Sequence, residues 1–219
     1  MEGTFFALAT PDFGLHPWWY LGRAGGFLAY SLLFLSMVLG IGVSSRVFDG
    51  LLARGWFFEM HKFLSLLVVA AVLFHVLVML PDPFAGFTVG DLFVPFVADL
   101  RTLPLSVGIF SFYGAVLVAF SFYATKWIGQ KAWRTLHYLA FLAYVGGAVH
   151  GVWAGTDTGL PAVRLFYLGT GMTLFFFVCY RLLALRNQKA PVKAVAAKPR
   201  ISAVPVPEGR VDERQTAAG

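Results

Sequence analysis

Four histidines in two hydrophobic stretches are the residues best suited to chemistry in this chain. His61 and His75 share one stretch, and His137 and His150 share another. Imidazole binds transition metals, and an ionisable side chain at membrane depth is costly, so such residues indicate a functional site. The spacings of fourteen and thirteen positions correspond to roughly 20 Å along a helix, about two-thirds of a hydrocarbon core of roughly 30 Å. Two facing helices would therefore present two His–His pairs, one near each membrane surface, which suits two stacked haems.

The composition is that of an integral membrane protein. Of the 219 residues, 58% are hydrophobic and only 13% are charged, and the mean hydropathy is +0.73. These values lie outside the range of soluble globular domains. The net charge of +6 comes largely from basic residues at the ends of hydrophobic stretches and in the tail, so we expect no nucleic-acid partner. The single cysteine, Cys179, supports neither a disulfide framework nor a thiolate metal site.

Five hydrophobic segments are each long enough to span a bilayer as a helix. In chain order they are Trp18–Ser44, Phe57–Leu80, Thr102–Thr125, Thr135–Thr156 and Arg164–Leu185. We therefore expect an all-α fold, a bundle of about five transmembrane helices surrounded by lipid in the cell membrane. The connection Pro81–Pro104 is apolar but contains scattered proline and aspartate, so we expect an interfacial or re-entrant cover over the outer half of the bundle.

The distribution of charge between the two sides predicts the orientation. Basic residues favour one side, with Arg46, Arg54, Lys62, Lys126, Lys131, Arg134, Arg181, Arg186, Lys189 and Lys193, whereas the other has Arg23, Arg101 and Arg164 beside Asp12, Asp82, Asp91, Asp99 and Asp157. This bias places the N-terminus outside and the C-terminus in the cytoplasm. The domains expected are a short outer segment 1–17, a membrane domain 18–185 and a basic cytoplasmic tail 186–219, which has too few large apolar residues to fold.

This orientation pairs the histidines by depth, His61 with His137 on the inner side and His75 with His150 on the outer. Fourteen positions leave two side chains roughly 40° apart on an ideal helix, whereas thirteen leave them roughly 140° apart. Gly146–Gly147 lies between His137 and His150 and could host a kink or a tightened turn, and helix tilt and imidazole rotamers could absorb the rest of the second angle. Hydrogen-bonding histidines in the bundle interior remain an alternative. So does a metal transporter, although a transporter more often brings Asp, Glu or Cys into the membrane.

The residues around these histidines resemble the ferric-reductase-like transmembrane domain. The similar stretches are Trp133–Tyr138, Ala148–Gly151, His61–Leu66 leading to His75, Leu21–Ala24, Leu39–Arg46 and Ala154–Gly159. That family includes ferric reductases, NADPH oxidases and the haem-binding subunit of the methionine sulfoxide reductase system. It uses the same two histidine spacings, and the resemblance covers about Trp18 to Leu185.

The resemblance implies two b-type haems, an inner one bound by His61 and His137 and an outer one bound by His75 and His150. Two imidazoles complete six-coordination, which favours electron transfer over chemistry at the iron. Arg23, near the outer end of the first segment, is a candidate partner for an outer haem propionate, or an arginine that snorkels to the interface. Unlike the oxidases and ferric reductases, this chain has no strand–GxGxxG–helix unit of a flavin and nicotinamide domain after its last segment.

We therefore expect a membrane di-haem cytochrome that relays electrons across the membrane as a subunit of an oxidoreductase system. The donor would be a separate flavoprotein or quinol, and the acceptor would lie on the outer side. We assign no catalytic residue. The alternatives are a ferric or quinone oxidoreductase that acts by itself, a haem- or metal-binding transporter, and a structural subunit.

Overall fold

The computed structural model describes residues 17–45, 53–83 and 85–189, and the regular structure in these ranges is entirely helical, as predicted. The elements are α1 (Pro17–Ser45), α2 (Arg54–Leu77), α3 (Val89–Phe93), α4 (Thr102–His137), α5 (Leu139–Ala154), the 3-10 helix η1 (Asp157–Gly159) and α6 (Pro161–Lys189). Four helices are long and apolar enough to cross a membrane: Pro17–Ser45, Arg54–Leu77, the joined stretch Thr102–Ala154 and Pro161–Arg186. The expected outer segment, apart from Pro17, and most of the expected tail lie outside the described residues, and α6 extends to Lys189 rather than ending at Leu185.

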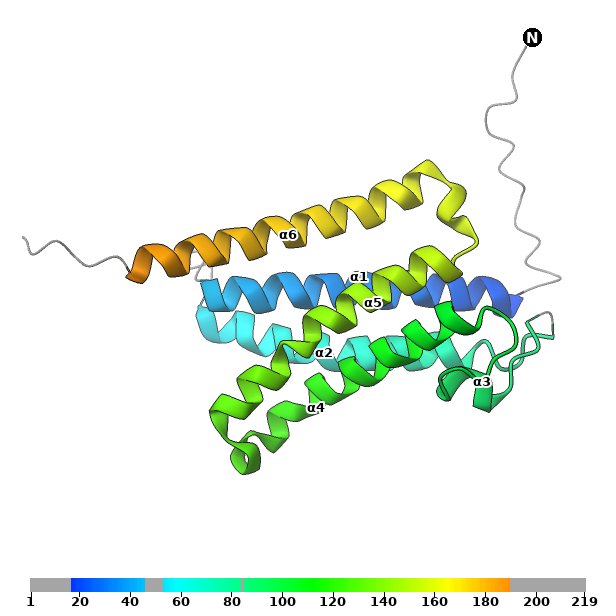
Figure 1. Cartoon of the computed structure of the whole chain (residues 1–219), viewed down its shortest axis with the longest axis horizontal. Helices are drawn as coiled ribbons and strands as arrows, with labels where there is room; N and C mark the ends of the chain where they lie inside the picture. The colour runs from blue at the N-terminus through cyan, green and yellow to red at the C-terminus, as the bar shows by residue number, and fades with distance from the viewer. Residues whose placement is uncertain (1–16, 46–52, 84, 190–219) are drawn as a thin grey trace, which may run out of the picture.

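The chain reverses direction inside the long stretch Thr102–Ala154. Gly129 leaves the helical conformation, with φ 79° and ψ 158°, a region open essentially only to glycine. Figure 1 shows the turn at the lower left, after which the end of α4 and all of α5 run back beside the first part of α4. The two arms pack closely, since a Cβ on Gly114 would lie 3.5 Å from the Cβ of Ala143. The connection expected between the third and fourth segments is therefore helical on both sides of one glycine.

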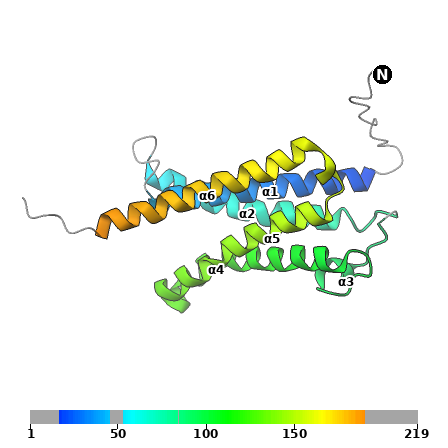
Figure 2. The ribbon, with the colours of Figure 1, turned by 45° about the horizontal axis from the view of Figure 1, so that its top comes forward.

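Helix α1 is the middle of the bundle. It packs against α2, α5 and α6, and α4 packs against α2 and α5 (Figure 1, Figure 2). Small residues allow α1 and α2 to approach closely, because a Cβ on Gly25 would lie 3.1 Å from Phe74 and 3.3 Å from the Cα of His75. The neighbours of α1 therefore include α2 and α5, which carry three of the four histidines.

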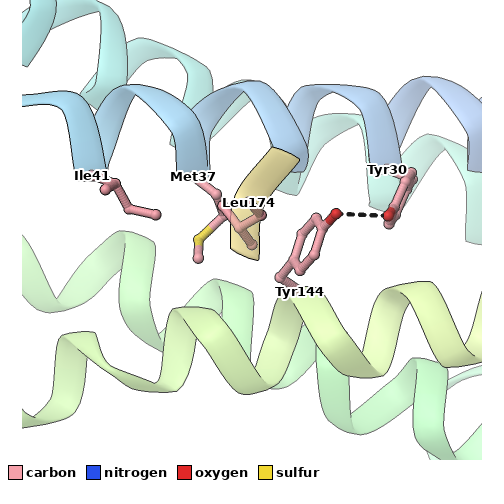
Figure 3. Packing of buried hydrophobic residues seen from close by; sticks show 5 residues of the cluster. All are labelled: Tyr30, Met37, Ile41, Tyr144 and Leu174. Carbon is pink, nitrogen blue, oxygen red and sulfur yellow. Dashed lines mark hydrogen bonds between the residues drawn. The ribbon is translucent and has the colours of Figure 1, made fainter. Parts of the chain in front are cut away.

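A buried cluster ties α1, α5 and α6 together. Its members are Tyr30, Met37, Ile41, Tyr144 and Leu174 (Figure 3). The Tyr30 hydroxyl lies 2.8 Å from the Tyr144 hydroxyl and 2.8 Å from the hydroxyl of Thr170. Since a buried hydroxyl without a partner is costly, these bonds fix the register of three helices. The outward face of α6 is apolar and exposed, which is typical of a helix that contacts lipid.

The connection between α2 and α4 contains no further long helix among its described residues, 81–83 and 85–101, as predicted. Its one helix, α3, has a capping box in which the Thr88 hydroxyl accepts from the Asp91 N–H while the Asp91 carboxylate accepts from the Thr88 N–H. The bond from the Thr88 N–H also lowers the pKa of the Asp91 carboxyl. Phe96 N–H donates to the hydroxyl of Ser106, which holds the connection against the start of α4.

Candidate functional site

The structure brings the four histidines together as two facing pairs. The ring centres of His61 on α2 and His137 at the end of α4 are 6.0 Å apart, with an interplanar angle of 72°. Those of His75 on α2 and His150 on α5 are 6.3 Å apart, with an angle of 73°. The same helix therefore supplies one member of each pair, and the returning arm of the α4–α5 hairpin supplies the other.

These separations match two imidazoles on opposite sides of one metal ion. A metal–nitrogen distance of about 2.0 Å, plus roughly 1 Å from the nitrogen to the ring centre, places two such rings roughly 6 Å apart. Both pairs therefore fit a metal centre with two axial imidazoles, such as a haem iron.

Three of the four rings are oriented by a hydrogen bond from Nδ1 to a backbone carbonyl of a neighbouring helix. The bonds are His61 to Ser36 at 2.9 Å, His75 to Gly22 at 2.6 Å and His150 to Pro104 at 2.8 Å. A carbonyl oxygen can only accept, so Nδ1 carries the hydrogen in all three rings. Their Nε2 atoms therefore hold a free lone pair, which is the form that binds a metal.

Each of these bonds depends on a glycine four residues after the carbonyl. The glycines are Gly40 beside His61, Gly26 beside His75 and Gly108 beside His150, where a Cβ would lie 3.0, 3.2 and 2.6 Å from the nearest ring atom. A helical side chain leans toward the N-terminus and covers the preceding turn, so glycine at that position leaves the carbonyl open to the ring. Sequence reasoning missed these glycines. The spacing of fourteen positions between Gly26 and Gly40 repeats that between His61 and His75 and could have indicated two of them.

His137 differs from the other three. Its Nδ1 is buried and has no hydrogen-bond partner among the described residues, and the same is true of Nε1 of Trp133, one turn earlier. The two rings pack together, with centres 5.1 Å apart and planes at 35°. Packing against an indole therefore orients His137, where carbonyl bonds orient the other histidines.

The prediction of a kink at Gly146–Gly147 is wrong. Helix α5 is continuous through both glycines, and the irregularity lies at Tyr138, directly after His137. The roughly 140° expected for an unbroken helix therefore does not apply to His137 and His150. The two glycines serve helix packing instead, since a Cβ on Gly146 would meet Ser111 of α4 and one on Gly147 would lie 3.7 Å from Leu33 of α1.

A cavity of about 540 Å³ surrounds the His75–His150 pair. That volume is within the range of about 300–1,000 Å³ for small-molecule and cofactor sites. Most of its wall is apolar, and Phe87 and Leu92 of the α2–α4 connection line it. The connection therefore lies over this pair.

Arg23 lies in the wall of this cavity. Its guanidinium forms an ion pair with Asp157 of η1, which also lines the cavity. A guanidinium has five N–H donors, so the ion pair leaves others available to an anionic group. Sequence reasoning did not give Asp157 this role. Arg101 lines the same cavity and donates to the carbonyl of Ala154.

Comparisons with known protein families, characterised proteins and solved structures found no match to this chain. The fold and the site alone therefore indicate the class of protein. The chain is a helical bundle of membrane type with two facing imidazole pairs at different levels of one helix.

Proposed function

We propose that this chain is a membrane b-type di-haem cytochrome that relays electrons between the two faces of the membrane. The observation that carries the proposal is the pair of ring separations, 6.0 and 6.3 Å, which fit two axial imidazoles per metal. Haem iron between two imidazoles gains and loses single electrons without an open position for a substrate. The resemblance of the flanking residues to the ferric-reductase-like domain supports the same function.

The proposed topology has five passes with the N-terminus outside and the C-terminus in the cytoplasm. The reversal at Gly129 supports the fifth pass, because it divides Thr102–Ala154 into two antiparallel arms. Each arm is long enough to cross a hydrocarbon core of roughly 30 Å at 1.5 Å per residue. The charge bias supports the orientation. His61 and His137 then form the inner site, and His75 and His150 form the outer site in the cell membrane.

The chain would contribute ligands, orientation and a dry environment. His61 and His137 would hold the inner haem, and His75 and His150 the outer one. The carbonyl bonds keep Nε2 of three of these rings free to coordinate. Arg23 would offer its remaining donors to a propionate of the outer haem.

Separate partners would complete the electron path. A cytoplasmic flavoprotein or a quinol would deliver electrons at the inner site, and an acceptor would take them at the outer face. The chain would thus act as one subunit of an oxidoreductase system. This part of the proposal rests on the resemblance, because fold alone does not specify a partner.

Haem counting on the purified full chain tests the proposal. We expect two haem b per chain by pyridine haemochrome assay. The double variants His61→Ala/His137→Ala and His75→Ala/His150→Ala should each retain one, and His16→Ala, at the fifth histidine, should retain two. A variant with all four histidines replaced should bind none. Wild-type protein without haem, or haem retained in the fourfold variant, would contradict the proposal.

A further inference from the structure

The two histidine pairs are not equally supported by the surrounding helices. Both rings of the His75–His150 pair donate from Nδ1 to a carbonyl, whereas in the other pair only His61 does so. Nδ1 of His137 is buried without a partner among the described residues. No described glycine would place a Cβ against the His137 ring. The carbonyl-and-glycine arrangement found at the other three histidines is therefore missing here among the described residues.

This difference has a chemical consequence for a metal ligand. A hydrogen bond from Nδ1–H to an acceptor fixes the tautomer and the ring orientation and makes Nε2 more basic. Loss of such an outer partner typically weakens metal binding about 10–100-fold. Among the described residues no acceptor would satisfy an Nδ1–H of His137, which disfavours the Nδ1–H tautomer needed for coordination through Nε2.

We propose that the His61–His137 site holds its haem less tightly than the His75–His150 site, and that the missing acceptor at His137 is the cause. The inference rests on the proposed function, since it concerns how the chain's own residues hold that group. Trp133 is the positioning residue of the weaker site, because its indole packs on the His137 ring where the other rings meet a carbonyl. The haem nearer the proposed cytoplasmic face is thus the exchangeable one.

Haem release from the two double variants tests the order of affinity. His75→Ala/His150→Ala keeps only the inner site, and His61→Ala/His137→Ala keeps only the outer site. With excess apomyoglobin as acceptor, we expect release from the inner site to be at least about tenfold faster. Equal release, or faster release from the outer site, would overturn the inference while leaving the proposed function intact. Wild-type protein that binds no haem would overturn both.

Substitution of Trp133 tests the cause. In the inner-site variant, Trp133→Gln places an amide oxygen on the side chain that faces His137, and Trp133→Phe is the matched control that keeps an aromatic ring without an acceptor. We expect Gln to slow haem release about tenfold relative to Phe. A more basic imidazole also favours the ferric state, so Gln should lower the midpoint potential, by about 59 mV for a tenfold change in the one-electron equilibrium. Equal release and equal potentials in the two variants would contradict the role of the acceptor.

Discussion

At the scale of the residue, the orientation of three histidine rings depends on backbone atoms, which a side-chain substitution cannot remove. The acceptors for His61, His75 and His150 are backbone carbonyls, which remain whatever side chain is present. Mutation can instead test the glycines that leave these carbonyls open to the rings. Gly108 is the most sensitive of them, because a Cβ there would lie 2.6 Å from Nδ1 of His150.

We expect Gly108→Ala to weaken haem binding at the outer site by about 10–100-fold, because the His150 ring must move and lose its bond to Pro104. The inner site should keep its haem. Gly171→Ala on α6 is the matched control, since a Cβ there meets nothing within 4 Å. Haem titration of both variants measures the effect, and wild-type affinity in Gly108→Ala would show that the contact does not matter.

The Arg23–Asp157 ion pair gives a second residue-scale prediction, this time for the potential of the outer haem. Arg23→Gln removes a positive charge from the cavity wall and should lower the midpoint potential, whereas Asp157→Asn should raise it. The Arg23 side chain is 32% exposed and already paired, so we expect changes of only about two- to tenfold in the reduction equilibrium.

Spectroelectrochemical titration in the His61→Ala/His137→Ala background isolates this haem. Arg164→Gln is the control, because Arg164 donates to Thr158 but does not line the cavity. Shifts of the same sign in Arg23→Gln and Asp157→Asn would rule out the electrostatic account.

At the scale of the element, the α4–α5 hairpin decides whether the two sides of each pair meet. Lys126, Gln130, Lys131 and Ala132 favour helix, so helix continues close to the turn on both sides, and Gly129 alone allows the reversal. The residues on both sides of Gly129 are mostly exposed, so few packing contacts are present to offset backbone strain at this position.

We expect Gly129→Ala to destabilise the protein by about 1–3 kcal/mol, because φ 79° with ψ 158° is strained for any residue with a Cβ. Gly55→Ala is the control, since a Cβ there meets nothing within 4 Å. Thermal denaturation in detergent, followed by the haem absorbance, measures the difference. Equal melting temperatures would mean that the turn tolerates a side chain.

The long helices and the histidine pairs could be predicted from the sequence, whereas the hydrogen bonds that orient the rings could not. Hydrophobic length located α1, α2 and α6 to within four residues at each end, because a spanning helix must cover the hydrocarbon core. The end predicted at Thr125 was wrong, since α4 continues to His137. Histidine spacing and charge bias predicted the pairs His61–His137 and His75–His150, which the structure brings together. The spacing of Gly26 and Gly40 could have indicated the two glycines on α1. The carbonyl bonds were not predictable, because they depend on which faces of α1 and α4 meet the histidines. The break between α4 and α5 at Tyr138 was not predicted either.

At the scale of the whole molecule, the two pairs lie at opposite ends of one helix, roughly 20 Å apart at 1.5 Å per residue. In the proposed relay, removal of either pair would leave most of the membrane thickness without a redox centre. In vesicles that contain the reconstituted full chain and trapped ferricyanide, external dithionite should bleach the ferricyanide. His61→Ala/His137→Ala and His75→Ala/His150→Ala should each abolish bleaching, and Cys179→Ser should not. Bleaching at the wild-type rate in either double variant would show that electrons cross without that pair, which would exclude a relay through both sites.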